Sequence, residues 1–291
     1  MNRRDFFKIS TSSIVIGSSQ SLFAMADDNL DSHIRDSIEL EHKEISQYIN
    51  SQFSLSHKQC ETFSKEILEK KPVIARYNDK LLLQSISIKL KQTQRLVGYG
   101  NFNLISFDEL LKTARNHSKI GAFSKEELAY IENIFYLHAS EYGFYGKKVT
   151  NQLSDKIKAS ETTKIPYTGH YLYKGEPQDL YERLKKEVGP SIVLTSGVRS
   201  VVKQLDLFLY KANKLDGNYS KAAHSLAPPG YSFHGISDFD VGKVGLGYRN
   251  FTSSFAKTKE YAKLQKLGYI SIRYPKNNPF GVRFEPWHIK V

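Results

Sequence analysis

From about residue 160 onward, short apolar runs alternate with longer amphipathic stretches, and glycine or proline stands at most of the boundaries. This alternation predicts short strands mixed with helices. The expected helices cover residues 177–188, 199–215 and 252–267, and the expected strands cover residues 191–195, 239–241, 269–274 and 282–289. The last two strands flank a turn at 275–281, which indicates an antiparallel hairpin. The sequence therefore favours an α+β fold with a small antiparallel sheet flanked by helices.

Residues 28–150 have a different, helical pattern. Apolar side chains recur close to one helical face between Leu30 and Phe53. Two segments, Ser106–Glu109 and Ser124–Glu127, resemble capping boxes that open helices, and the second helix is expected to end near Gly143 and Gly146. A chain of 291 residues is long enough for two domains. We therefore expect an all-α N-terminal domain at 27–150, a linker at 151–168 and a second domain at 169–291.

Composition excludes two kinds of site. Cys60 is the only cysteine, so the chain can form neither an intramolecular disulfide nor a cysteine-cluster metal site. Any bound metal must therefore have nitrogen and oxygen ligands. No apolar run is long enough for an internal transmembrane helix, so we expect no membrane span in the mature protein.

Positive charge is concentrated in the second half of the chain. Residues 160–291 contain 20 lysines and arginines against 11 aspartates and glutamates, whereas residues 27–159 are nearly balanced. A basic region attracts anionic partners. The lysines are spread through the expected helices, and the sequence has no zinc-finger or RNA-recognition signature. This favours acidic cell-wall peptides over nucleic acid as the partner.

Residues 1–26 have the features of an export signal. A basic start, Arg3–Lys8, is followed by a modest apolar stretch and by Ala24–Ala26, which resembles a cleavage site. The paired arginines before Phe-Phe-Lys resemble the twin-arginine export signal of bacteria. The alternative, a buried helix, suits the many serines of this stretch poorly. We expect the mature protein to begin near Asp27 and to reside in the periplasm.

The segment Phe284-Glu-Pro-Trp-His288 contains a carboxylate and a histidine close together. On an extended strand Glu285 and His288 point to opposite faces, but Pro286 could twist the chain locally so that both reach one site. Such a pair suits a zinc site in which histidine binds the metal and glutamate handles protons. Taken alone, the pair is more often structural.

Two further segments carry candidate chemistry. In residues 232–242, His234 precedes Asp238 and Asp240, and the two aspartates lie on the same side of an expected strand. These residues could supply ligands to a metal, or they could form a turn that only caps the strand. In Thr195–Gln204 a glycine turn places Arg199 at the start of an expected helix. Arg199 could form an anion-binding site there with free backbone N–H groups, or it could equally be a solvated residue on the helix surface.

Together these segments resemble the VanY-type zinc D-alanyl-D-alanine carboxypeptidases. That family has an S-G-Y-R-S stretch with a glutamine five residues after the arginine, then P-G-x-S-x-H-x-x-G-x-A-x-D-L-G, G-F-x-x-R-Y-P and a closing E-P-W-H. The corresponding segments here, in the same order, are Ser196–Ser200 with Gln204, Pro229–His234 with Asp240–Gly242, Gly268–Pro275 and Glu285–His288. The resemblance covers roughly residues 190–291.

The resemblance implies a role for each matched residue. His234, Asp240 and His288 would bind Zn²⁺, and Glu285 would be the general base that activates the zinc-bound water and later protonates the leaving amine. Arg199 would bind the terminal carboxylate of the substrate, with Gln204 and Ser232 nearby for orientation. The implied function is a periplasmic D-alanyl-D-alanine carboxypeptidase, expected to be a monomer, that trims peptidoglycan stem peptides.

The sequence departs from the family pattern at one important point. The pattern has seven positions from its histidine to its aspartate, but His234 and Asp240 are six apart, and the pattern's glycine and alanine are missing. Asp240 aligns best because Asp-Val-Gly matches Asp-Leu-Gly, while Asp238 stays open as the alternative ligand. A second departure is milder: Val198 stands where the family pattern has tyrosine. The alternative functions are an L,D-carboxypeptidase, a cross-link endopeptidase of the same family and a wall-binding module without catalysis.

Overall fold

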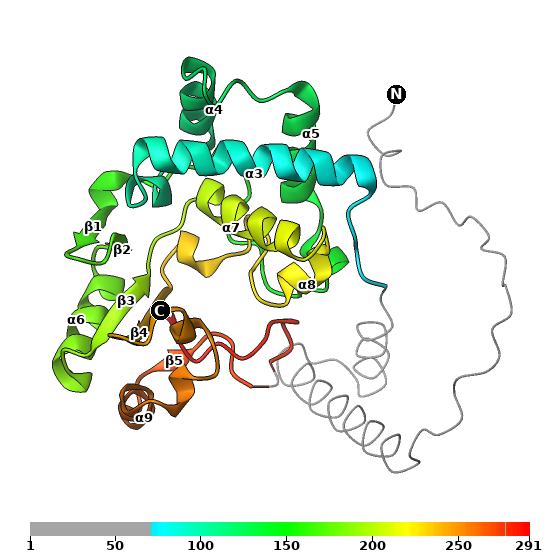
Figure 1. Ribbon diagram of the computed structural model, residues 1–291. Helices are drawn as coiled ribbons and strands as arrows, with labels where there is room; N and C mark the ends of the chain where they lie inside the picture. The colour runs from blue at the N-terminus through cyan, green and yellow to red at the C-terminus, as the bar shows by residue number, and fades with distance from the viewer. Residues whose placement is uncertain (1–70, 277) are drawn as a thin grey trace, which may run out of the picture. The chain divides into compact units, whose positions relative to one another are not determined.

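The computed structural model describes residues 71–276 and 278–291 (Figure 1). The expected export signal, the apolar pattern between Leu30 and Phe53, and Cys60 lie outside the described residues. Among the helices that are described, none combines the length and the apolar character that crossing a membrane would need.

The N-terminal part of the described chain is helical. It contains α3 (Tyr77–Val97), α4 (Phe107–Asn116) and α5 (Lys125–Tyr136). Both expected capping boxes are confirmed, because each serine accepts from the backbone N–H of the glutamate three residues on, and each glutamate accepts from the backbone N–H of its serine.

Helix α5 ends earlier than the sequence suggests. The side chain of His138 accepts from the backbone N–H of Ser140 and so starts a separate short 3₁₀ helix, Ala139–Tyr142. Gly143 ends this second helix, with a φ of 79° that glycine adopts without strain.

Two antiparallel sheets follow. A hairpin pairs β1 (Thr162–Ile165) with β2 (His170–Tyr173), so the stretch expected to be a linker contains a strand. The larger sheet has the strand order β3-β4-β6-β5, and its strands are β3 (Ile192–Ser196), β4 (Phe239–Lys243), β5 (Ser271–Ile272) and β6 (His288–Lys290). All of its neighbouring strands are antiparallel. The α+β fold class is confirmed.

Four further helices complete the second half. They are α6 (Glu176–Val188), α7 (Val201–Lys214), α8 (Tyr219–Ala223) and α9 (Lys259–Lys266). The prediction that a helix starts at residue 252 is wrong, because Thr258 caps α9 with its side chain and short 3₁₀ turns fill the preceding residues. The strands expected at 269–274 and 282–289 are also shorter than predicted.

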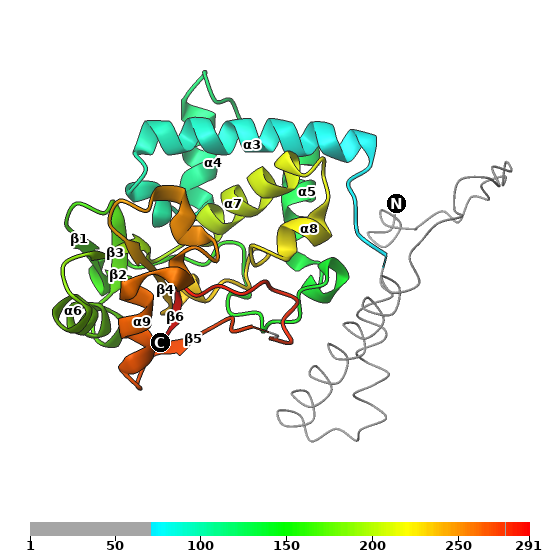
Figure 2. The ribbon, with the colours of Figure 1, turned by 60° about the horizontal axis from the view of Figure 1, so that its bottom comes forward.

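The apolar core forms two clusters. One lies between the sheet and helices α6 and α9, and its members include Leu184, Phe239 and Ile289. The other joins α3 and α5 to α7 and α8, and Figures 1 and 2 show α3 lying along α7. Side chains from both sides of the expected domain boundary, such as Leu90 and Leu209, therefore belong to one buried cluster.

Candidate metal and substrate site

The register of the sheet places two polar residues side by side. In β4, Phe239 and Val241 point into the apolar cluster below α6, so Asp240 between them points to the opposite face. In β6, Ile289 points into that cluster and His288 points away from it. Because Phe239 pairs with Ile289 and Asp240 pairs with His288, the carboxylate and the imidazole meet on the face of the sheet opposite α6 and α9.

His234 reaches the same place from a neighbouring turn. It lies in a short 3₁₀ helix, Phe233–Gly235, and its Nδ1 is 2.8 Å from the carbonyl oxygen of Gly197. Since a carbonyl only accepts, Nδ1 carries the ring proton and Nε2 offers a lone pair. Nε2 lies 3.2 Å from Asp240 Oδ1.

Gly197 allows this contact because its backbone passes directly against strand β2. A Cβ at this position would lie 1.9 Å from the carbonyl oxygen of Tyr171. The next residue, Val198, donates its N–H to that same carbonyl, and the N–H of Arg199 donates to the carbonyl of His234. The glycine turn after β3 therefore fixes both Arg199 and His234.

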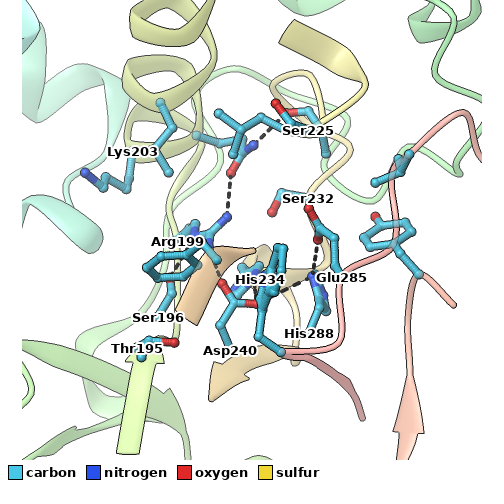
Figure 3. A pocket seen from close by; sticks show the side chains of 18 of the residues that line it. Thr195, Ser196, Arg199, Lys203, Ser225, Ser232, His234, Asp240, Glu285 and His288 are labelled. Carbon is cyan, nitrogen blue, oxygen red and sulfur yellow. Dashed lines mark hydrogen bonds and ion pairs between the residues drawn. The ribbon is translucent and has the colours of Figure 1, made fainter. Parts of the chain in front are cut away.

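These residues form a buried group that fits a metal ion. Ligand atoms of His234, Asp240 and His288 all lie within 4.8 Å of one another (Figure 3). His288 Nδ1 is 3.6 Å from Asp240 Oδ1. His234 Nε2 and Asp240 Oδ1 are buried and have no hydrogen-bond partner. Unpartnered buried polar atoms are costly, so their convergence indicates a site for a cation. Two imidazole nitrogens and a carboxylate oxygen are a donor set that Zn²⁺ accepts.

Asp238, the alternative ligand, lies outside the group. Its carboxylate is bound by the guanidinium of Arg273, at 2.7 Å from Nε and 2.8 Å from the terminal nitrogen. It also lies 3.0 Å from His288 Nε2, the ring nitrogen that faces away from Asp240. Asp240 is therefore the aspartate that the structure places with the two histidines.

Glu285 reaches the group through a tight turn. The N–H of His288 donates to the carbonyl of Glu285, so Pro286 and Trp287 form a turn and the two side chains meet, with Glu285 Oε2 3.4 Å from His288 Nδ1. Alternation along a strand does not apply, because only His288 belongs to β6.

Contacts with two other parts of the chain hold the Glu285 segment in place. The N–H of Glu285 donates to the carbonyl of Tyr274. Before Glu285 in the chain, the carbonyl of Phe280 accepts a hydrogen bond from the N–H of Tyr145. Gly281 passes so close to Gly143 that a Cβ on Gly281 would lie 2.0 Å from the carbonyl oxygen of Gly143.

Arg199 is held in place by three hydrogen bonds. Its Nε donates to Ser196 Oγ at 2.9 Å, and one terminal nitrogen donates to Asp240 Oδ2 at 2.7 Å. The other terminal nitrogen is 3.5 Å from Gln204 Oε1. Asp240 thus uses one oxygen for the guanidinium and keeps the other for the metal group. Figure 3 shows Ser232 between Arg199 and Glu285.

Burial and neighbouring charges shift the pKa values of the site. Burial and the nearby Arg199 lower the pKa of His234 to about 4, so the ring is neutral. Burial also opposes charge on His288, but its hydrogen bonds to Asp238 and Glu285 outweigh this effect and raise its pKa to about 9. A metal ion that binds His288 must displace a proton. Burial raises the pKa of Glu285, and its hydrogen bond to His288 opposes that rise.

The group opens into a cavity of about 360 Å³. The cavity holds every site residue predicted from the sequence: Arg199, Gln204, Ser232, His234, Asp240, Glu285 and His288. It also contains residues that sequence reasoning missed, above all His170 from β2. His170 Nδ1 and Thr195 Oγ1 are buried without a hydrogen-bond partner. No sequence pattern marks His170, because the hairpin brings it to the site from outside the matched segments.

A second cavity, of about 480 Å³, continues from the first. Both cavities are lined by Lys211, Ser225 and Arg283, and the second adds Lys221 and His224. No aspartate or glutamate of the described residues lines it. The path that leads away from the metal group is therefore cationic.

Residues 174–291 match the family model described as VanY: D-alanyl-D-alanine carboxypeptidase. The expected resemblance is confirmed for this region, which begins just before α6 and contains all seven predicted site residues. Helices α3 to α5 and the β1–β2 hairpin lie outside it. No curated protein matches the chain.

Three solved structures resemble part of the chain. The vancomycin-resistance D,D-dipeptidase VanXYg, in complex with a D-Ala-D-Ala phosphinate analogue, is 20% identical with a TM-score of 0.38, over 43% of this chain and 51% of that chain. A mutant of the D,D-pentapeptidase VanY from a VanB-type resistance cassette, in complex with Zn(II), is 24% identical with a TM-score of 0.32, over 45% and 77%. VanYB in complex with D-alanine-D-alanine is 23% identical with a TM-score of 0.33, over 45% and 76%. The chain spans about half the length of the first of these.

Proposed function

We propose that the protein is a zinc-dependent D,D-carboxypeptidase that removes the C-terminal D-amino acid of peptidoglycan stem peptides. The observation that carries this proposal is the buried group of His234, Asp240 and His288, with two unpartnered ligand atoms and with Glu285 beside it. The match of residues 174–291 to the D-alanyl-D-alanine carboxypeptidase model supports the substrate class.

The donor set supports zinc as the metal. His234 Nε2, His288 Nδ1 and one oxygen of Asp240 would hold the ion, and three protein ligands leave a position open. Zn²⁺ bound there would lower the pKa of a water molecule and polarise the carbonyl of the scissile peptide bond.

Glu285 performs the proton transfers in this proposal. Burial raises the pKa of its carboxyl group, which makes it a better base near neutral pH than an exposed glutamate. Glu285 takes a proton from the attacking water and later gives it to the departing amine. The turn through Pro286 and Trp287 holds its carboxylate at the group while its backbone is bound to Tyr274.

Arg199 selects the end of the peptide. Its guanidinium is fixed by Ser196, Asp240 and Gln204, so it is already oriented toward the cavity before a substrate binds. A fixed arginine beside the reacting bond suits a terminal carboxylate, which an internal peptide bond lacks. Ser232 lies between this arginine and Glu285, where it can orient the last residue.

Export to the periplasm belongs to the same proposal, since stem peptides lie outside the cytoplasm. The paired residues Arg3 and Arg4 are the feature that supports the twin-arginine route. Replacing both with lysine should leave the precursor in the cytoplasm, as fractionation and immunoblotting would measure. Normal export of the doubly substituted protein would remove this part of the proposal.

The activity is tested with the mature protein, loaded with zinc and given a stem pentapeptide that ends in D-Ala-D-Ala. Mass spectrometry should show loss of a single alanine, and a chelated sample and a Glu285→Ala sample should show none. Glu285→Ala should retain zinc and lose turnover by several orders of magnitude, whereas His288→Ala should lose the metal as well. A wild-type rate in Glu285→Ala would contradict the role of Glu285.

Two related substrates separate the alternatives. Cleavage of a tetrapeptide but not of the pentapeptide would indicate an L,D-carboxypeptidase, and cleavage of cross-linked dimers would indicate an endopeptidase. A zinc-loaded protein that binds sacculi and cleaves none of the three would be a wall-binding module, and the proposed activity would be wrong.

A further inference from the structure

His288 must bind a metal ion through one particular ring nitrogen. Its Nδ1 faces Asp240 and Glu285, whereas its Nε2 faces Asp238. A neutral imidazole carries one proton, and the hydrogen bond made by one nitrogen decides whether the other keeps a free lone pair. The partner of Nε2 therefore determines whether Nδ1 is available as a ligand.

Asp238 is surrounded by donors. Its side chain is 0% exposed and accepts two hydrogen bonds from Arg273 and one, at 3.1 Å, from the N–H of Val291. A carboxylate held by a bidentate guanidinium is ionised and only accepts hydrogen bonds. It can interact favourably with His288 Nε2, at 3.0 Å, only when that nitrogen carries the proton.

Arg273 is itself fixed. Its guanidinium stacks 3.8 Å from the centre of the Phe233 ring, and its backbone N–H donates to the carbonyl of His288 at 3.0 Å. Phe233 is the neighbour of the second histidine of the group, His234. The guanidinium, the carboxylate and the imidazole therefore form one buried chain of contacts that ends at the metal group.

The two histidines of the group are oriented by different partners. A backbone carbonyl, that of Gly197, fixes the tautomer of His234. The corresponding partner of His288 is the side chain of Asp238, which occupies the position where the VanY-type pattern has alanine. This departure makes the contact a property of this chain that substitution can remove.

We propose that Asp238 and Arg273 are positioning residues, which hold the proton of His288 on Nε2 and its ring in the orientation that presents Nδ1 to zinc. Asp238 does not bind the metal itself. The inference rests on the proposed role of His234, Asp240 and His288 as the zinc site, and it explains why a second aspartate lies two residues before Asp240.

The test compares zinc affinity in Asp238→Asn and wild type, by competition with a chromophoric chelator. Asparagine has nearly the same shape, but its amide can donate to Nε2, which moves the ring proton to Nδ1. Zinc should bind roughly 10–100-fold more weakly, the usual cost of losing such a partner. The matched control is Asp206→Asn, since Asp206 is equally buried but pairs with Lys91 and Lys203. It should lose stability and keep its zinc affinity within about twofold of wild type.

Ring ¹⁵N chemical shifts of zinc-loaded wild type provide a readout that a purely structural role would not move. They should show His288 bound through Nδ1, with a slowly exchanging proton on Nε2. Binding through Nε2 would overturn the proposal whatever the variants do. So would a folded Asp238→Asn protein with wild-type zinc affinity. If circular dichroism shows that this variant does not fold, Arg273→Lys, which keeps the charge and loses the bidentate contact, should show a smaller loss of affinity.

Failure of this inference and failure of the proposed function give different results. If the wild type binds zinc but cleaves none of the three peptides, the activity is wrong while the affinity comparison still decides the role of Asp238. If the wild type cleaves the pentapeptide and Asp238→Asn binds zinc equally well, the activity stands and the positioning role is wrong.

Discussion

Asp240 and Arg199 depend on each other, because the carboxylate uses Oδ2 for the guanidinium and Oδ1 for the metal group. Under the proposed function the arginine therefore has two tasks: it holds Asp240 as a metal ligand, and it binds the terminal carboxylate of the substrate. A lysine would keep the charge but lose the planar set of donors that Ser196, Asp240 and Gln204 fix together.

Arg199→Lys should lower kcat/KM roughly 10–100-fold for a peptide with a free C-terminal carboxylate, the range expected for losing a hydrogen bond to a charged group. The measurement uses a pair of peptides that differ only in a terminal acid or amide. The variant should lose much less on the amide, because the contact to the carboxylate is absent there already. An equal loss on both peptides would mean that Arg199 does not bind the terminal carboxylate.

At the residue level, the sequence motifs predicted the residues that the structure gathers in one cavity and favoured Asp240 over Asp238, but they left Asp238 open as the alternative. Asp238 and Asp240 have the same residue type and lie on the same side of the chain, so spacing alone does not separate them. The choice depends on strand register, since Asp240 pairs with His288 across the sheet while Asp238 is bound by Arg273. Register is a long-range property that a local motif does not contain.

At the level of elements, a single residue decides the local structure at two places: the turn between β3 and α7, and the contact between α3 and α5. The turn positions Arg199 and His234 through the backbone of Gly197. The helix contact is made by Glu127, which caps α5 and also accepts hydrogen bonds from Lys89 and Ser85 of α3.

Gly197→Ala should destabilise the protein by about 1–3 kcal/mol, since the added methyl group would overlap the carbonyl oxygen of Tyr171. It should also weaken zinc binding, because the carbonyl that orients His234 would move. The matched control is Gly235→Ala, whose Cβ would meet Thr150 Oγ1 at an ordinary 3.5 Å. Thermal unfolding of both variants checks this, and equal melting temperatures would contradict it.

Glu127→Gln should lower the free energy of unfolding at pH 7 by about 1–3 kcal/mol. Burial opposes ionisation of Glu127, but the hydrogen bonds from Lys89, Ser85 and Ser124 outweigh it and lower its pKa below the ordinary 4.5. The folded state then binds this proton less readily than the unfolded state. Its contribution is therefore complete above about pH 4.5 and is lost as the pH falls through the lowered pKa.

Urea unfolding between pH 7 and pH 3 measures this contribution. The wild type should lose stability more steeply below pH 4.5 than Glu127→Gln. Glu132→Gln, an exposed change on the same helix, is the control and should follow the wild-type curve. Parallel curves for wild type and Glu127→Gln would show that the ionised carboxylate adds nothing.

Local sequence signals predicted the two helix starts that have a clear capping box. They misplaced the start of α9, where two threonines are possible caps. Ser106 and Ser124 are each followed by a glutamate at the capping position, and both helices begin there. Helix α9 starts later than the sequence predicts, because Thr252 and Thr258 are both plausible caps. In the folded chain, Thr252 Oγ1 donates to Arg249 within a turn, and Thr258 caps the helix.

At the scale of the whole molecule, α3 and α5 share a buried cluster with α7, the helix that follows Arg199. The residues that touch in this cluster lie far apart in the sequence. Helical periodicity shows only that one face of a helix is apolar, and it does not show which other element covers that face. For the same reason no local sequence pattern predicts that the hairpin brings His170 to the cavity.

A chain that begins at residue 151 should therefore fail to fold cooperatively. It would expose Leu205, Phe208 and Leu209 of α7, each 0% exposed in the full structure. The fragment should bind the hydrophobic dye ANS and lack a sharp thermal transition, whereas a chain that begins at residue 71 should unfold cooperatively. A sharp transition in the shorter fragment would show that its core is self-sufficient.

The contact of Gly281 with Gly143 limits how this protein can exchange parts during evolution. The segment that carries Glu285 fits against a loop of the helical region with no room for a side chain on Gly281. A recombination event between residues 151 and 173 would join residues 174–291 to another protein's helices and bring a foreign loop against them. Only a donor whose loop leaves the same space for the backbone at Gly281 would yield a working hybrid, so the two regions should have been inherited together.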